Sequence, residues 1–454
     1  MKKYFYLAAV SAMMLTACSS DNDVVQPKQE PTTPQVAVQQ QAVAFDTYLS
    51  GTTASTRAGD AGIQTNATLK AANKGFGVFA NYSNDAGYTT GSSINPSNFM
   101  YNQQVKYSAD GGWTYEPLKY WPNETGNDSQ ADPATSSATD YLSFFAYAPY
   151  VSSASGTTGI TDMIANNATN SDPWVTYKVA SKPSESVDLL WGVAPTGNLI
   201  YTDVASNGVN KVAGMPLFDL TKPSKDQKIK FLFQHALARI GMTVVAAIDQ
   251  ISAGGELSAT TKIAVKSVVI TETTNDGATP TPALTPYLRT TGNLNLKNTA
   301  PFKSLWSSLG GTINFTVSNA AGGELNPNIA YDTNAATTYA KTAPWTGVTA
   351  TETPVIADGN YFMVIPGNTT NGDQNVELQV VITYAVITAD AKLADSYSEV
   401  ENVITKKVTI NKFTNNKAYN LKLILGLTSV KLDAEVADWK VDGSTEVYLP
   451  QNAE

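Results

Sequence analysis

Residues 41–49 read Gln41-Ala42-Val43-Ala44-Phe45-Asp46-Thr47-Tyr48-Leu49, and polar and apolar side chains alternate along them. Val43, Phe45 and Leu49 fall on one side of an extended chain with Thr47, whereas Ala44, Asp46 and Tyr48 fall on the other. A period of two with one mostly apolar face predicts a half-buried β-strand. The pattern ends at Ser50-Gly51, and a loop of small residues that contains Arg57 follows. An arginine in such a loop is a typical protease site.

The same alternation returns along the rest of the chain. Near the carboxyl end it predicts three strands, whose buried faces carry Val376, Leu378, Val380, Ile382 and Tyr384, then Tyr419, Leu421, Leu423 and Leu425, then Val430, Leu432, Ala434 and Val436. Earlier strands are predicted at residues 75–80, 113–115, 119–122, 141–149, 187–191 and 229–235. No heptad pattern or long amphipathic helix occurs. The sequence therefore predicts an all-β fold of antiparallel β-sandwiches.

The 454 residues are enough for two or three domains. Residues 221–226, Thr-Lys-Pro-Ser-Lys-Asp, are polar, charged and broken by a proline, which is typical of a linker. We therefore expect an N-terminal β-sandwich at residues 41–222 and a C-terminal one at residues 223–454. Residues 18–40 contain three prolines among Gln, Thr and Val, and are expected to form an extended tether.

The amino end predicts export. Lys2 and Lys3 precede an apolar run from Phe5 to Ala17, which is too short to span a membrane as a helix and is typical of a secretory leader at residues 1–17. The leader resembles a bacterial lipoprotein signal, with the lipobox at residues 15–18, so lipidation is expected at Cys18. No other cysteine exists in the chain, which excludes an internal disulfide. The acidic residues after Cys18 resemble signals that send lipoproteins to the cell surface, so we expect an outer-membrane lipoprotein there.

Composition argues against several functions. The net charge of −9 disfavours nucleic acid as a partner, because nucleic acid needs basic patches. His235 is the only histidine, so catalytic triads and multi-histidine metal sites are hard to build, and its place on an apolar strand face favours a hydrogen-bonded core histidine. We expect neither catalysis nor a cofactor. Acidic loops at Asn84-Asp85 and at Asp128 to Asp140 leave a calcium site as an alternative, although they lack known calcium-loop spacing.

Several segments, taken in order, resemble the fimbrillin (Mfa-like) proteins of Bacteroidales. They are Gly75-Phe76-Gly77-Val78, the stretch from Tyr115 to Pro122, the stretch from Leu142 to Pro149, the stretch from Phe231 to Ile240, and Val436-Ala437-Asp438-Trp439. The resemblance extends from the lipobox nearly to the carboxyl end. It implies two tandem transthyretin-like β-sandwich domains and a subunit, at the shaft or the tip, of a type V pilus.

The resemblance also implies a way of assembly. In that family the subunits are exported as lipoproteins, and an arginine-specific protease removes the segment that ends at a loop arginine, here Arg57. Removal would take away Val43, Phe45 and Leu49, each of which contributes roughly 1.5–3 kcal/mol of burial. It would leave an unpaired sheet edge, which a strand of the next subunit can fill. The alternative is that the strand stays in the fold and Arg57 is an ordinary loop residue.

The incoming strand must come from another subunit. Thr445, Val447 and Leu449 share one face of a stretch before Pro450, so this stretch is a candidate donor strand. The alternative is a last strand paired within its own domain, which would fit a tip subunit better than a shaft subunit.

A second class of function remains open, a surface adhesin or glycan-binding module that does not polymerise. Exposed aromatic rings stack on sugars, and candidates in or near loops are Trp113, Tyr115, Trp121, Trp174 and Trp345. The alternative is that these rings pack against the edge of a sandwich. The partners expected overall are other pilin subunits, an arginine-specific protease, the outer membrane through the lipid, and a host or bacterial surface glycan or protein.

Overall fold

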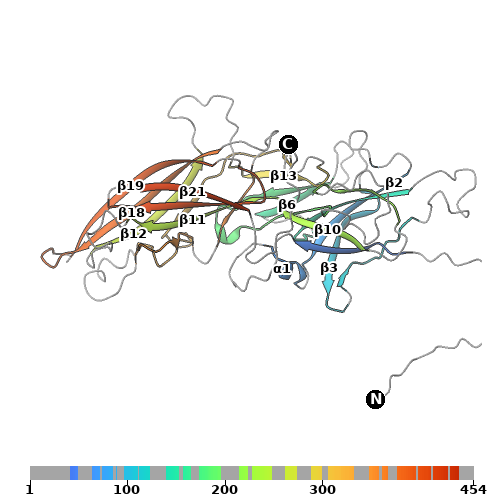
Figure 1. Ribbon diagram of the computed structural model, residues 1–454, viewed down its shortest axis with the longest axis horizontal. Helices are drawn as coiled ribbons and strands as arrows, with labels where there is room; N and C mark the ends of the chain where they lie inside the picture. The colour runs from blue at the N-terminus through green and yellow to red at the C-terminus, as the bar shows by residue number, and fades with distance from the viewer. Residues whose placement is uncertain are drawn as a thin grey trace, which may run out of the picture. The chain divides into compact units, whose positions relative to one another are not determined.

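The computed structural model describes residues 41–49, 64–71, 74–84, 88, 97–110, 112–122, 140–152, 157–164, 173–195, 214–222, 228–247, 261–272, 288–298, 305–331, 347–356, 360–366, 376–394, 397–410, 413–427 and 430–438. These residues form four β-sheets with one short helix, α1 (Asn66–Lys70), and one 3-10 turn at Pro183–Glu185 (Figure 1). The expected all-β class is confirmed. Among these residues no helix is long and apolar enough to cross a bilayer.

The largest sheet has eight strands and contains the amino-terminal strand β1. Its order is β1 (Ala44–Leu49), β10 (Lys228–His235), β8 (Leu190–Val193), β5 (Asp140–Ala148), β2 (Phe76–Asn84), β3 (Met100–Ser108) and β4 (Gly112–Thr114), and β9 (Leu217–Leu220) also pairs with β5. Strand β5 is buried on both faces, since every residue from Leu142 to Ala148 is inaccessible to solvent. This sheet therefore separates two apolar cores.

A four-stranded sheet covers one face of the large sheet. It contains β6 (Gly159–Ile164), β7 (Trp174–Lys178), β13 (Thr291–Asn295) and β14 (Trp306–Ser307). Two buried indoles join it to the large sheet: Trp191 Nε1 donates to the Leu296 carbonyl at 3.1 Å, and Trp306 Nε1 donates to the Ala236 carbonyl at 3.0 Å. These bonds pair the polar atom of each large apolar side chain inside the core.

The remaining two sheets face each other across a shared core. One contains β11 (Ala238–Ala246), β16 (Thr353–Pro354), β17 (Phe362–Val364), β20 (Lys417–Leu425) and β21 (Val430–Asp438). The other contains β12 (Thr261–Glu272), β15 (Phe315–Ser318), β18 (Val376–Ala389) and β19 (Tyr397–Ile410). The apolar faces of β18 and β20 are buried as their alternation predicts. In β21 the face opens toward solvent along the strand, and Val436 is 49% exposed.

Strand pairing differs from the expectation in two respects. The sheets are not purely antiparallel, because β1 pairs with β10, and β11 with β20, in parallel. In addition, residues 119–122 do not form a strand, and only Tyr120 makes an isolated bridge, to Ala42. Pro122 has no N–H to donate, so the segment cannot continue as a regular ladder beyond Trp121.

The large sheet also crosses the expected boundary between residues 222 and 223. Strand β10 follows that boundary but pairs with β1 and β8, and β13 pairs with β7. The chain passes from the large sheet to the sheet of β11 at Ala236-Leu237, both fully buried. A division at residues 222/223 would therefore cut two sheets. The change of sheet takes place in the core, at Ala236-Leu237.

The Gly75-Phe76-Gly77 motif has a steric cause. Gly77 faces Tyr147 of the neighbouring strand, and a Cβ at this position would lie 2.3 Å from the Tyr147 ring. Glycine therefore lets the Tyr147 ring lie flat on β2, while Phe76 points to the opposite core.

The β1 slot as candidate functional site

The buried face of β1 lies in an aromatic core. Val43 and Phe45 are 1% exposed and Leu49 is 3% exposed. The Phe45 ring contacts four other rings, with centroid distances of 5.5 Å to Tyr115, 5.7 Å to Phe144, 6.0 Å to Phe231 and 6.2 Å to Phe76. Phe45 therefore joins three elements of the large sheet to the 115–121 segment through one side chain.

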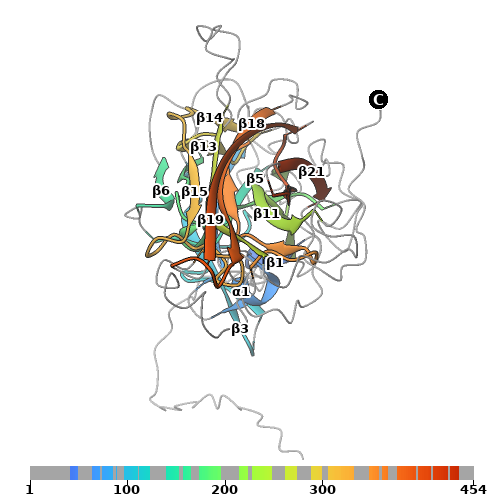
Figure 2. The same cartoon turned by 90° about the vertical axis from the view of Figure 1, so that its left-hand side faces the viewer.

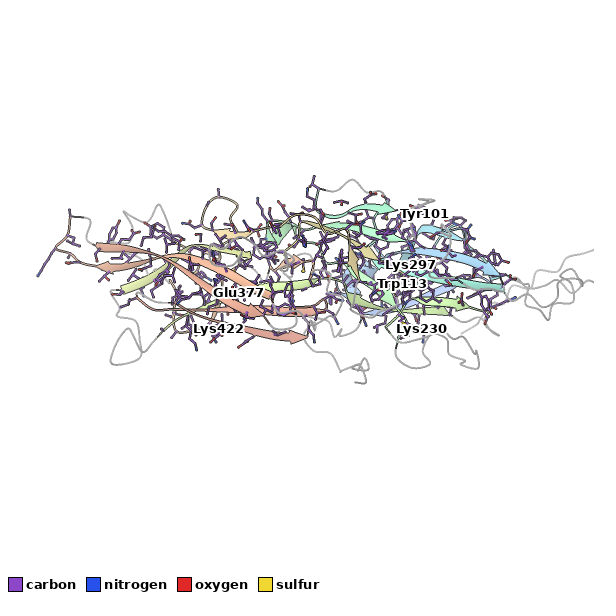
Figure 3. The ribbon with its side chains drawn as sticks, turned by 90° about the horizontal axis from the view of Figure 1, so that it is seen from above. Tyr101, Trp113, Lys230, Lys297, Glu377 and Lys422 are labelled. Atoms are coloured by element: carbon purple, nitrogen blue, oxygen red, sulfur yellow. The ribbon has the colours of Figure 1, made fainter. Side chains whose placement is uncertain are left out.

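β1 closes the large sheet on itself. β1 and β4 stand at opposite ends of the strand order, yet the two strands lie in contact. β1 contacts both β4 and β10, which carry Trp113 and Lys230, the two residues labelled for these strands in Figure 3. The sheet therefore curls around the core that contains Phe45, and β1 fills the gap between its ends. We call this position the β1 slot, bounded by β10, β4 and residues 115–121.

The two edges of β1 are bonded differently. On one edge all six residues pair in register with Lys228–Phe233 of β10. On the outer edge, the Val43 N–H donates to the Lys119 carbonyl at 2.8 Å, and Trp121 N–H donates to the Gln41 carbonyl at 2.9 Å. Farther along that edge side chains accept the bonds: Thr47 N–H donates to Asp46 Oδ1 at 2.8 Å and Leu49 N–H to Asn66 Oδ1 at 3.3 Å. Side chains therefore satisfy an edge that a further strand would otherwise pair.

Tyr115 is the polar centre of the slot. Its hydroxyl donates to the Val43 carbonyl at 2.8 Å and accepts from the Lys119 N–H at 3.2 Å. Burial raises the pKa of Tyr115 to about 12, against the opposing effect of the hydrogen bond with the Lys119 backbone. The hydroxyl therefore stays neutral and keeps its proton for Val43 at any ordinary pH.

After β1, the next residue that the structure describes is Gln64. Gln64 N–H donates to Asp188 Oδ2 at 3.1 Å, and the same oxygen lies 2.8 Å from His235 Nδ1 at the end of β10. Asp188 and His235 are buried, so the histidine is a hydrogen-bonded core residue as its position on β10 predicts. Besides the Asp188 contact, the segment that starts at Gln64 is joined to β1 by the hydrogen bond from Leu49 N–H to Asn66 Oδ1, and Figure 2 labels β1 and α1 beside each other.

Comparison with known proteins finds no match among family models or among curated proteins. Solved structures do match. A fimbrial protein from Bacteroides vulgatus aligns with a TM-score of 0.56 at 20% identity, over 88% of this chain and 100% of that chain. The chain has the fold of a Bacteroides fimbrial protein. This agrees with the fimbrillin resemblance of the sequence.

Two weaker likenesses involve a proposed cell adhesion protein and a second fimbrial protein, both from Bacteroides ovatus. The first aligns with a TM-score of 0.40 at 11% identity, over 89% of this chain and 100% of that chain. The second aligns with a TM-score of 0.25 at 10% identity, over 81% of this chain and 47% of that chain. At these scores they add nothing to the assignment of the fimbrial fold.

Several predicted site residues lie outside the described part of the chain. They are Cys18, Arg57 and the candidate donor residues Thr445, Val447 and Leu449, together with residues 1–17 and the tether at 18–40. Leu49 and Gln64 are the described residues that flank the loop of Arg57. Of the predicted site residues, the structure brings together Val43, Phe45 and Leu49, all in the β1 slot.

The aromatic residues considered for glycan stacking are mostly core residues of the fimbrial fold. Trp113, Tyr115 and Trp121 are 9%, 4% and 2% exposed, so a sugar cannot reach their faces. Trp174 is half-buried and Trp345 lies outside the described residues. The expectation of an exposed stacking platform is wrong for the three buried rings, because they line the curled sheet instead.

The described residues also bear on the calcium alternative. Asp140 begins β5, is buried, and accepts the Tyr82 hydroxyl hydrogen bond at 2.5 Å, while Asp85 and Asp128 lie outside the described residues. In the parts of the chain that the structure describes, no group of three His, Cys, Asp or Glu side chains is placed to hold a metal ion.

Sequence reasoning missed the residues that satisfy the outer edge of β1. Asp46, Asn66 and Tyr115 are polar groups far apart in the sequence or on the face opposite to the core. One feature of the sequence indicated that Tyr115 lies close to a sheet: it directly follows Trp113-Thr114, which is part of a predicted strand, and it precedes a turn at Pro117. No local pattern indicates that its hydroxyl meets Val43, 72 residues earlier.

Proposed function

We propose that this protein is a pilus subunit at the bacterial surface, in which β1 is a removable plug and a strand of a second subunit replaces it. The supporting observation is the β1 slot: an edge strand fills the gap in a curled sheet and covers an aromatic core. The fimbrial fold supports a pilus or adhesin role. A sheet edge that can accept another strand supports a role in assembly, in which subunits join by strand pairing. Such a role requires no catalysis.

Loss of β1 would leave an exposed binding site with a defined shape. The backbone groups of β10 from Lys228 to Phe233 would lose their partner strand. Phe76, Phe144 and Phe231, now fully buried, would face the opening. Both effects favour binding of an extended segment with apolar residues at alternate positions. A strand of another copy meets these requirements without any change in the rest of the sheet.

The chain suits selective cleavage at Arg57. Its other two arginines are Arg239 and Arg289. Arg239 lies in β11, paired on both sides and stacked on the Tyr361 ring at 4.4 Å. Arg289 is half-buried and donates to the Gly310 carbonyl at 2.9 Å. An arginine-specific protease acting on folded protein should therefore cut at Arg57 first.

The experiment treats folded protein with such a protease and follows both cleavage and size. We expect a new amino terminus at Ala58, followed by polymers visible by light scattering and electron microscopy. The matched control is Arg57→Ala, which should stay uncut and monomeric. Cut protein that loses residues up to Arg57 and remains monomeric at high concentration would rule out strand exchange. Protein purified from the cell surface with a start at Cys18 alone would rule out cleavage in the cell.

We further propose that residues 443–454, with Thr445, Val447 and Leu449 on one face, are the strand that is lent. Deletion of this segment separates lending from retention. Loss of polymer with unchanged folding supports a strand that is donated to another subunit. Misfolding of the shortened protein shows that the strand pairs within its own subunit. In the second case the protein fits a tip subunit better than a shaft subunit.

The surface location is proposed to depend on lipid at Cys18 and on the tether at residues 18–40. Cys18→Ser should move the protein from the membrane fraction to the soluble fraction without changing its fold. A non-polymerising adhesin is the competing function. The burial of Trp113 and Trp121 argues against an adhesin that stacks these rings on a glycan. Cut protein that stays monomeric and binds a surface glycan or protein would support the adhesin function.

A further inference from the structure

On its outer edge the β1 segment is held by backbone hydrogen bonds at its amino end and by side chains at its carboxyl end. Beyond the β10 ladder, the chain from Gln41 to Val43 forms a short antiparallel pairing with residues 119–121, centred on the Ala42 to Tyr120 bridge. Val43 N–H donates to Lys119 and the Val43 carbonyl accepts from the Tyr115 hydroxyl. Both backbone groups of Val43 on that edge are therefore satisfied by one segment, residues 115–121.

The 115–121 segment is itself fixed in the core. The rings of Tyr115 and Trp121 are buried, and Trp121 packs against Phe144 with a centroid distance of 6.0 Å. Between them the chain turns outward, so that Leu118 and Tyr120 are 50% and 43% exposed. The segment has two buried anchors with an exposed bridge between them, and Gln41 to Val43 lies against that bridge.

The carboxyl end of β1 is held on its outer edge by side chains. Thr47 N–H donates to the carboxylate of its own neighbour, Asp46, and Leu49 N–H donates to the side chain of Asn66. Those bonds can be made and broken by rotation of a side chain, whereas release of Val43 must break a backbone hydrogen bond to Lys119 and the hydrogen bond from the buried Tyr115 hydroxyl. The expected cut at Arg57 would also create a free chain end on the Leu49 side.

We propose that residues 115–121 act as a clasp, so that strand exchange begins at Leu49 and releases Val43 last. This inference rests on the proposed function, and it assigns Tyr115 as the positioning residue that decides how long the cut plug stays bound. An incoming strand would pair with β10 from the Leu49 side while the clasp still covers the core near Phe45. The core would then not be exposed to water during the exchange.

Cys18 provides the probe for the test, because it is the only cysteine of the chain and lies in the released fragment. A dye on Cys18 of the full, non-lipidated chain reports the fragment that ends at Arg57, and its dissociation after cleavage is followed by fluorescence anisotropy. Tyr115→Phe keeps the ring and removes the hydroxyl. We expect this variant to release the fragment about tenfold faster, which corresponds to about 1.4 kcal/mol.

The matched control is Tyr120→Phe in the same segment. Tyr120 is 43% exposed, and the described residues make no hydrogen bond to its hydroxyl. Its release rate should stay within about twofold of the parent. Equal release rates for Tyr115→Phe and the parent would overturn the clasp, even if polymers form. Absence of polymers after complete release would instead contradict the proposed function and leave the clasp measurement valid.

Hydrogen exchange tests the order of release independently. In cut protein that still holds its fragment, the Leu49 amide should lose protection before the Val43 amide, and Tyr115→Phe should shorten the interval between them. Loss of protection at Val43 first would show that the exchange starts at the other end. A simultaneous loss would show that the plug leaves in one step and that there is no clasp.

Discussion

Replacement of Phe45 by alanine should loosen β1 more than any other single truncation in the strand. Phe45 is 1% exposed and contacts the rings of Tyr115, Phe144, Phe231 and Phe76 at centroid distances of 5.5–6.2 Å. Truncation of a fully buried phenylalanine typically costs about 3–5 kcal/mol, through lost burial and the cavity left behind. These contacts come from four separate elements, which cannot all move in to fill the space, so we expect a value in that range.

Because β1 is an edge strand, this cost should appear as local opening of β1 in the uncut chain. A loss of about 3 kcal/mol increases the open population roughly 150-fold. Native-state hydrogen exchange at the Val43 amide measures that opening directly. The control is Phe413→Ala, since Phe413 is equally buried but packs on Tyr419, with a centroid distance of 4.8 Å, away from β1. Unchanged protection of Val43 in Phe45→Ala, or equal loss in Phe413→Ala, would refute the view of β1 as a separately removable element.

Three further predictions concern ionisable groups. Because the pKa of Tyr115 is raised to about 12, its neutral form stabilises the folded protein fully below pH 10, and this contribution is lost as the pH rises from 10 through 12. The titration of Tyr115 is measured as the difference in absorbance at 295 nm between the parent and Tyr115→Phe. It should occur near pH 12 in the uncut chain and nearer pH 10 once the plug has left. Asp188→Asn should weaken the hydrogen bonds to Gln64 and His235 and lower the free energy of unfolding in urea by about 1–3 kcal/mol. Hydrogen exchange of the Gln64 amide should also become faster. An unchanged urea midpoint would show that the buried Asp188–His235 pair adds nothing to the stability of the fold. Hydrogen bonds from Lys422 and Thr243 lower the pKa of Glu352 below 4.5, so Glu352 stabilises the fold above that pH and loses the effect as the pH falls through its folded pKa. Glu352→Gln should therefore have a cost at pH 7 that shrinks as the pH falls below 4.5, and the cost should be small because solvent screens this partly exposed pair.

Alternation along the chain predicted which faces of the strands are buried, because that information is local. In β1, β18 and β20 the apolar side chains at alternate positions are all in the core. The same logic failed for β10, where Leu232 and Gln234 are buried as well as Phe231 and Phe233. A strand covered on both faces carries no alternation, and β10 lies between the aromatic core of the β1 slot and the core shared with the second sheet.

Which strands pair could not be predicted, because pairing depends on contacts between distant parts of the chain. β1 meets β10 across about 180 residues and in parallel orientation, which no turn specifies. The burial of Trp113 and Trp121 follows from the curl of the same sheet, and loop-like sequence around them gave no sign of it. The change of sheet at Ala236-Leu237 was hidden because two buried strands in succession look like one apolar run.

The position of β1 is what the proposed removal requires, a buried strand at the end of the strand order. Without it the order β10, β8, β5, β2, β3, β4 remains a continuous sheet, whereas loss of β10 or β5 would divide the sheet. The fold therefore keeps its pairing while one edge and one aromatic face become exposed. That exposed surface is costly in water, since apolar area contributes roughly 25 cal/mol per Å². If β1 is removed as proposed, the geometry that closes the uncut chain would make the cut subunit bind an alternating strand, and the pockets that Val43, Phe45 and Leu49 leave behind would set the specificity of that binding.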